Sequence, residues 1–195
     1  MRVVAGRHRG RRLVAPKGRA VRPTSDRARG ALFDILTHLA RTGEGPALAE
    51  ARVLDAFAGT GALGLEALSR GAAHASFMER DRAALEALGR NIEACGETAS
   101  TEILRVDATR PPAAGAACHI VFLDPPYGEG LAARALAALA AKGWLAPGAI
   151  AAIEIGARED FDPPDGFALH DERRYGAARI VIVTRAPESP ATIVR

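Results

Sequence analysis

The residues best suited to chemistry in this sequence are the consecutive Asp124, Pro125, Pro126 and Tyr127. They directly follow residues 120–123, an unbroken apolar run typical of a buried parallel strand. Open α/β sheets bind their ligands at the carboxyl ends of such strands, and the two prolines make the loop stiff. A carboxylate, carbonyls with no competing N–H groups and an aromatic face suit a planar base that carries an amino group. The loop is therefore a candidate catalytic site for amine chemistry.

A glycine turn forms a second candidate site. Residues 59–64 read Gly-Thr-Gly-Ala-Leu-Gly and match the literal G-x-G-x-x-G pattern of dinucleotide-binding sites. Those sites bring a pyrophosphate to a helix N-terminus. Asp55, four residues before Gly59, would add negative charge near that position. This arrangement favours a ligand with a cationic amino group over a pyrophosphate.

Two further acids follow the next predicted strands. Glu79 ends the strand near 74–79 and is placed to accept both hydroxyls of a ribose. Asp107 follows the strand near 102–106, where an adenine amino group could donate to it. With Asp55 and Asp124, acids then stand at four successive strand ends, which is hard to explain by chance. Their pattern predicts one cleft at that edge of a sheet.

The elements that would position these side chains alternate between strand and helix. We expect strands near 52–57, 74–79, 102–106, 119–124 and 149–155, with helical stretches near 62–70, 81–95 and 130–142. This is the βαβ pattern of a parallel sheet covered on both faces. Residues 167–173 and 179–184 are too close together for a crossover helix, so they predict a closing antiparallel hairpin. The expected fold is α/β, a Rossmann-like doubly wound sheet.

The N-terminal part departs from this rhythm. Short apolar pairs among Gly and Arg in residues 1–24 predict a small hairpin, and a helix is expected to begin at Asp26. We therefore expect a basic N-terminal extension over residues 1–45, packed on a catalytic domain over residues 46–186. Residues 187–195 are expected to form a flexible tail.

The positive charge is concentrated in that extension. Residues 1–30 hold ten basic residues against one acid, whereas the rest of the chain holds 16 basic and 22 acidic residues. A basic end on an acidic body is typical of a protein that binds a polyanion, and arginine suits phosphate and bases. The candidate nucleic-acid-binding residues, which the resemblance described below implies to be RNA-binding, are Arg7, Arg9, Arg11, Arg12 and Arg22.

Composition excludes several other classes. The 195 residues are 48% hydrophobic, enough for one domain with a sizeable core. The sequence contains no apolar run of the roughly 20 residues that a membrane span needs, and its N-terminus lacks the apolar core of a signal peptide. Cys95 and Cys118 have no neighbours at metal-binding spacing, and no metal is expected. We expect a reduced cytoplasmic protein.

Two long motifs carry a resemblance to a known family. The pattern from Asp55 to Gly61, together with the strand-end acids and the Asp-Pro-Pro-Tyr loop, resembles the S-adenosylmethionine-dependent amino-methyltransferases. Residues 22–36 are similar to the R-P-T-x-D-x-x-R-x-x-L-F-x-I-L block of the RsmD-like family, the bacterial 16S rRNA guanine(966)-N2 methyltransferases. The resemblance covers about residues 1–185. It departs at Gly30, where that family usually has Glu.

The resemblance implies a reaction and a set of roles. The reaction would transfer a methyl group from S-adenosylmethionine to the exocyclic N2 of a guanine in ribosomal RNA, in an assembling small subunit, and the enzyme would be a monomer. The implied cofactor-binding residues are Thr24, Asp55, Phe57, Gly59, Gly61, Glu79 and Asp107. The implied catalytic residues are Asp124, Pro125, Pro126 and Tyr127, where Asp124 and the Pro125 carbonyl would accept the N–H groups of the target amine.

Other functions remain open at this point. The same Asp-Pro-Pro-Tyr loop serves adenine and cytosine amino-methyltransferases acting on DNA or RNA. The literal glycine pattern keeps a nicotinamide-dependent oxidoreductase as a less favoured alternative. A non-catalytic RNA-binding protein with a vestigial pocket is a further one. Cofactor binding and methyl transfer would separate these alternatives.

Overall fold

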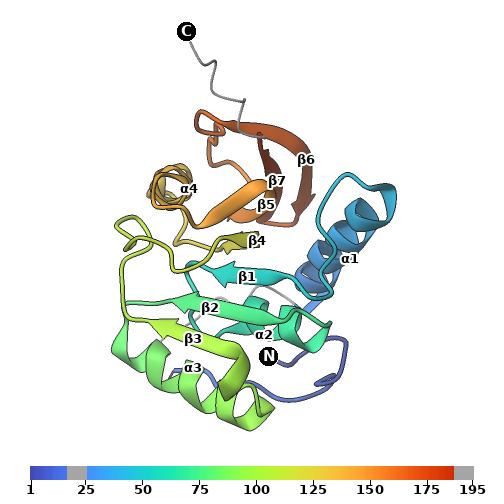
Figure 1. Cartoon of the computed structure of the whole chain (residues 1–195), viewed down its shortest axis with the longest axis vertical. Coiled ribbons are helices and arrows are strands. Elements are labelled where there is room, and N and C mark those ends of the chain that lie inside the picture. The colour runs from blue at the N-terminus through green and yellow to red at the C-terminus, as the bar shows by residue number, and fades with distance from the viewer. Residues whose placement is uncertain (17–25, 187–195) are drawn as a thin grey trace, which may run out of the picture.

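A computed structural model describes residues 1–16 and 26–186 (Figure 1). Within these ranges the chain forms one seven-stranded sheet in the order β3-β2-β1-β4-β5-β7-β6. The strands are β1 (Arg52–Asp55), β2 (His74–Met78), β3 (Thr101–Leu104), β4 (Cys118–Leu123), β5 (Leu145–Gly156), β6 (Phe167–Tyr175) and β7 (Ala178–Arg185). Strands β1 to β5 pair in parallel, and β7 pairs antiparallel with both β5 and β6. The predicted fold class is confirmed.

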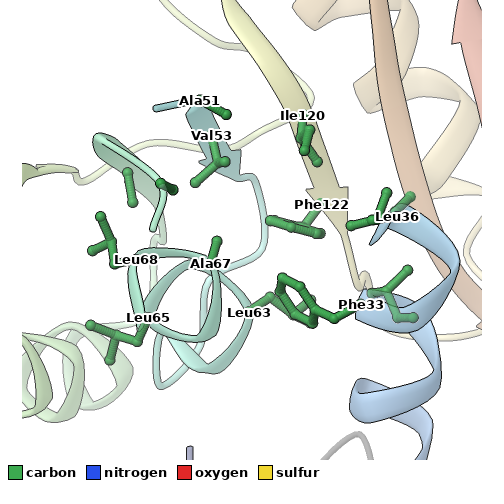
Figure 2. Close-up of a cluster of buried hydrophobic side chains, with 14 of the residues drawn as sticks. Phe33, Leu36, Ala51, Val53, Leu63, Leu65, Ala67, Leu68, Ile120 and Phe122 are labelled. Atoms are coloured by element: carbon green, nitrogen blue, oxygen red, sulfur yellow. The ribbon is translucent and has the colours of Figure 1, made fainter. Parts of the chain in front are cut away.

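Helices cover both faces of this sheet. They are α1 (Asp26–Thr42), α2 (Ala62–Ser69), α3 (Arg82–Cys95) and α4 (Leu131–Ala141), and a short 3-10 turn, η1 (Thr98–Ser100), follows α3. One core cluster joins α1, α2 and α3 to the sheet, and a second joins α4 to the other face. In the first cluster the rings of Phe33 on α1 and Phe122 on β4 lie 5.5 Å apart (Figure 2). The central strand β4 thus reads as a near-continuous apolar run because both of its faces are buried, whereas the edge strands β3 and β6 are more polar and exposed.

Strand β5 begins four residues earlier than the sequence pattern predicts. The pattern places its start near residue 149, but Leu145 already pairs with Cys118 of β4. The register then shifts, and Ile150 pairs with Ile120. Pro147 therefore lies in the irregular part of the pairing, where a missing N–H interrupts no regular ladder. The proline concealed the start of the strand from sequence reasoning.

Residues 1–16, called the N-terminal strap below, form the described part of the predicted basic hairpin. Val3 N donates to Arg11 O at 2.9 Å, and Leu13 N donates to Met1 O at 3.1 Å. Glu66 on α2 docks the strap and is 0% exposed. Its carboxylate accepts the backbone N–H groups of residues 4 and 5 at 2.7 and 2.9 Å. A buried carboxylate needs such donors, so the strap and α2 satisfy each other.

The crossing of α2 over β2 leads to a first prediction. A Cβ added at Gly64 would lie 2.3 Å from Cε1 of Phe77, so Gly64→Ala is expected to lower the free energy of unfolding by about 1–3 kcal/mol. Urea denaturation measures this change. The matched control is Gly89→Ala on α3, where an added Cβ meets nothing within 4 Å and helix propensity predicts a gain of up to about 1 kcal/mol. Equal stability of the two variants would contradict the close packing.

Candidate functional site

A cavity of about 910 Å³ opens at the carboxyl ends of the parallel strands. Asp55 ends β1, Glu79 follows β2, Asp107 lies three residues after β3, and Asp124 follows β4. All four acids line this one cavity. Five more of the predicted site residues line it as well: Phe57, Gly59, Pro125, Pro126 and Tyr127. The structure therefore brings together the side chains that the strand-end pattern singles out.

One predicted cofactor-binding residue is placed differently, and another lies outside the described residues. Gly61 is not among the residues that line the cavity. It has a φ of 80° at the start of α2, and a Cβ there would lie 2.4 Å from Cδ1 of Leu88. Glycine is thus required at position 61 by the turn and by the packing of α3. Thr24 lies outside the described residues, as does Arg22.

Asp55 is a buried acid whose pKa is raised by its surroundings. It is 1% exposed, and its Oδ2 accepts the backbone N–H of Gly64 at 3.0 Å. Burial raises the pKa of Asp55 to about 7, with a further contribution from the nearby Glu79, against the lowering effect of the Gly64 N–H. A backbone N–H in the first turn of α2 is therefore taken by a carboxylate, which disfavours pyrophosphate binding and favours a cationic ligand.

Glu79 ties the glycine turn to the start of α3. Its Oε2 accepts Gly59 N at 2.9 Å, and its Oε1 accepts Arg80 N at 2.7 Å and Asp81 N at 2.8 Å. Asp81 in turn caps α3 by accepting Ala84 N at 3.0 Å. These bonds fix the Glu79 carboxylate at the edge of the cavity without using all of its acceptor sites.

Asp107 is held as an anion by its neighbours. Its Oδ1 accepts the backbone N–H and the hydroxyl of Thr109 at 2.9 and 2.8 Å, and its Oδ2 lies 3.1 Å from Nη1 of Arg80. The Thr109 N–H and hydroxyl, with smaller contributions from Arg80 and Arg110, hold the pKa of Asp107 below its usual range. An ionised carboxylate there can accept a ligand amino group.

The Asp-Pro-Pro-Tyr loop is supported by two glutamates, one on β5 and one just after that strand. The hydroxyl of Tyr127 donates to Oε1 of Glu154 at 2.8 Å, and Gly128 N donates to Oε2 of Glu159 at 3.0 Å. Sequence reasoning missed both glutamates. Glu154 lies between two isoleucines, a pattern that marks only an alternating strand. The Tyr127 ring is therefore held in one orientation at the cavity wall.

Two of the candidate RNA-binding arginines, Arg7 and Arg11, lie at the far end of α2 and α3 from the cavity. Arg7 binds Oε1 of Glu97, just after α3, at 2.9 and 2.5 Å, and Arg11 donates to the carbonyl of Ala94 in the last turn. The cavity lies at the first turn of the same helix, and 14 residues span about 21 Å. Arg9 and Arg12 are exposed, and no side-chain hydrogen bond or ion pair to them is found within the described residues.

Two further features are absent from the described parts of the chain. Over residues 1–16 and 26–186, no cluster of His, Cys, Asp or Glu is arranged to hold a metal ion. In the same ranges, no helix has the length and apolar character needed to cross a membrane.

Comparisons with known proteins extend these observations. The family model described as conserved hypothetical protein 95 matches residues 1–184. Ribosomal RNA small subunit methyltransferase D of Escherichia coli is 37% identical over 178 residues, 90% of this chain and 85% of that protein. The protein of the same name from Haemophilus influenzae is 32% identical, over 90% of this chain and 89% of its own length. A solved structure of yhhF from Escherichia coli superposes with a TM-score of 0.81 at 35% identity, covering 96% and 99% of the two chains.

Proposed function

The chain belongs to the conserved hypothetical protein 95 family, the RsmD-like family that its motifs resemble, and on that premise we propose that it methylates the exocyclic N2 of a guanine in small-subunit ribosomal RNA. The observation that carries this proposal is the shared cavity. The Asp-Pro-Pro-Tyr loop, suited to an aromatic amine, lines the same 910 Å³ space as the three acids suited to a nucleoside with a cationic tail. A volume of this size lies within the usual range of about 300–1,000 Å³ for cofactor and small-molecule pockets.

The residues present fit S-adenosylmethionine as the methyl donor. Asp55 is buried and only partly ionised near neutral pH, so a ligand with an ammonium group would stabilise its charged form. Glu79 would accept the ribose hydroxyls, and Asp107 the adenine amino group. Phe57 and Gly59, which line the same wall, would contact the rest of the ligand. When bound, the cofactor supplies a methyl group that its sulfonium has already activated.

The catalytic work of the protein is alignment and charge stabilisation at the target amine. The lone pair of guanine N2 is delocalised into the ring, which makes it a poor nucleophile. Asp124 and the Pro125 carbonyl would accept the two N–H groups and turn the lone pair toward the methyl group. Asp124 would then stabilise the positive charge that develops on N2. Tyr127, oriented by Glu154, would stack on a base that has left its helix, an interaction typically worth about 1–3 kcal/mol.

Transfer of labelled methyl from S-adenosylmethionine to undermethylated small-subunit particles, with nucleoside analysis of the product, tests the function. We expect N2-methylguanosine at a single site. N6-methyladenosine or a methylated cytosine would keep the fold and cofactor but replace the substrate. No incorporation into particles, naked RNA or DNA would remove the enzymatic proposal. A nicotinamide-dependent reaction is not proposed, because Asp55 occupies the helix N–H that a pyrophosphate would use.

The strap arginines give a prediction about RNA binding. Arg9→Glu with Arg12→Glu is expected to weaken RNA binding and to reduce the salt slope of log K by about one for each phosphate that the protein no longer neutralises. The affinity for S-adenosylhomocysteine should stay unchanged, because both residues lie on the strap surface and neither lines the cavity. Filter binding at several salt concentrations and calorimetry measure the two effects. An equal loss of RNA and cofactor affinity would contradict this separation.

Arg7 and Arg11 would respond differently in the same experiment. Their side chains already bind Glu97 and Ala94, and Glu97 is 4% exposed. Substituting Arg7 removes two N–H donors from the buried Glu97 carboxylate, so a loss of RNA binding would combine with a loss of stability. Arg9 and Arg12 are therefore the cleaner variants.

The biological setting completes the proposal. We propose that residues 1–45 form the RNA-binding extension of a catalytic domain over residues 46–186, and that the enzyme acts as a cytoplasmic monomer on an assembling small subunit. The predicted tail, residues 187–195, lies outside the described residues. Support comes from the names of the relatives and from the basic strap docked on the domain.

A further inference from the structure

Asn91 on α3 is a buried polar residue that joins the strap to the glycine turn. It is 1% exposed. Its Oδ1 accepts Val14 N at 2.8 Å, and its Nδ2 donates to Val14 O at 3.0 Å and to Thr60 O at 2.9 Å. Three of the four hydrogen bonds that an amide can make are thus used on two different segments of backbone.

The identity of the side chain matters for this arrangement. An aspartate of the same size could accept the Val14 N–H but would present a carboxylate to the carbonyls of Val14 and Thr60. An alanine would leave these three backbone groups without this partner, and the bond to Thr60 O is the buried one. Asn91 is therefore suited to hold the strap and the glycine turn in one fixed relation.

The two segments also meet at the cavity itself. Met1 and Pro16, near the two ends of the strap, line the cavity together with Thr60. The hydroxyl of Thr60 lies 3.9 Å from Sδ of Met1. The strap thus begins at the cavity, turns at the far end of α2 and returns to the cavity.

We propose that Asn91 is a positioning residue that couples docking of the strap to cofactor binding. A ligand that orders the turn around Thr60 fixes the Thr60 carbonyl, which accepts one Nδ2 bond of Asn91. The Asn91 side chain is then held in the orientation that binds Val14, and this favours the docked strap. Coupling of this kind is reciprocal, so a docked strap strengthens cofactor binding by the same factor. The inference rests on the proposed function for its ligand. It deepens that function, because docking of the basic RNA-binding segment and binding of the cofactor then strengthen each other.

Residue-resolved hydrogen exchange tests the coupling in the full chain. The probes are the amides of Val4 and Ala5, whose acceptor is Glu66 and which touch neither Asn91 nor the cavity. Saturating S-adenosylhomocysteine, with its affinity measured by calorimetry, is expected to slow their exchange about ten-fold, within the usual range for coupled sites. In Asn91→Ala the ratio of the exchange rates without and with ligand is expected to fall to about one. Cofactor affinity is expected to fall about ten-fold.

The matched control is Ser69→Ala, which loosens the strap without touching the glycine turn. Ser69 Oγ accepts His8 N at 2.9 Å and donates to Ala5 O at 2.5 Å. We expect faster exchange in this variant but the same ratio with and without ligand. Bound ligand that leaves the exchange of the unchanged chain unaltered would overturn the coupling while the proposed function stands. A ratio that persists in Asn91→Ala would overturn the role of Asn91. An unchanged chain that binds no S-adenosylhomocysteine would remove the proposed function itself.

Discussion

Asp55→Asn is expected to stabilise the ligand-free protein at pH 8 while weakening its binding of S-adenosylmethionine. The pKa of the buried carboxyl is raised to about 7, so above that pH the folded protein carries a buried charge. The difference of about three units from the unfolded chain corresponds to at most about 4 kcal/mol. An amide of the same shape avoids this cost and still accepts the Gly64 N–H, but it offers no charge to a cationic ligand.

The pH dependence fixes the sign of this effect. Below about pH 4 the carboxyl is protonated in both states, so it does not affect stability. Between about pH 4 and 7 the unfolded chain releases the proton and the folded chain keeps it, so the folded state loses stability as the pH rises. Above about pH 7 the loss is complete. The advantage of Asp55→Asn should therefore grow from near zero at pH 4 to its full value at pH 8.

Urea denaturation at pH 4, 6 and 8, with calorimetric titration of the cofactor, measures both parts. Asp107→Asn serves as a control of opposite sign, because the pKa of Asp107 is lowered and its loss should destabilise the protein above pH 4. A pH-independent difference between Asp55→Asn and the unchanged chain would show that the carboxyl is not the cause.

Asp124→Ala is expected to lower turnover by about 10²- to 10³-fold, as removal of one preorganised group at a developing charge usually does. Cofactor affinity should change by less than about two-fold, because the acids proposed for the cofactor come from other strands. Single-turnover methyl transfer and calorimetry measure the two quantities. An Asp124→Ala enzyme with full activity would exclude the proposed role.

Tyr127→Phe is the matched control in the same loop. It removes the hydroxyl that binds Glu154 but keeps the ring that would stack on the base. We expect a loss of less than about ten-fold, seen mainly as a higher KM for RNA. A loss as large as that of Asp124→Ala would mean that the position of the ring, more than the carboxylate, limits the reaction.

The strand-end acids could be predicted because the fold repeats one local rule. The parallel strands end at the same ligand-binding edge of the sheet, and each acid lies at the end of its strand or up to three residues beyond it. Asp55, Glu79, Asp107 and Asp124 needed only that rule to be placed together. The βαβ order and the closing hairpin followed from periodicity and from the length of the connections in the same way.

The rest of the site depends on interactions that periodicity does not encode. Asn91 and Glu66 appear in the sequence as ordinary polar residues of helices, yet their partners lie in the strap, 77 and 62 positions away. Glu154 supports Tyr127 across 27 positions. The charge of the strap predicted its partner class, but only the fold shows that Arg7 and Arg11 bind the far end of α3.

The same long separations order the events of protein synthesis. The strap leaves the ribosome before its anchors, because Glu66, Ser69, Asn91 and Glu97 follow their strap partners by 61 to 90 positions. At a synthesis rate of about 5–20 residues per second, several seconds pass between synthesis of the strap and synthesis of its anchors. Interactions so distant in sequence form late. Substitutions at Ser69 or Glu97 should then speed unfolding more than they slow folding, because the strap is made before its anchors yet is among the last segments to reach its native place.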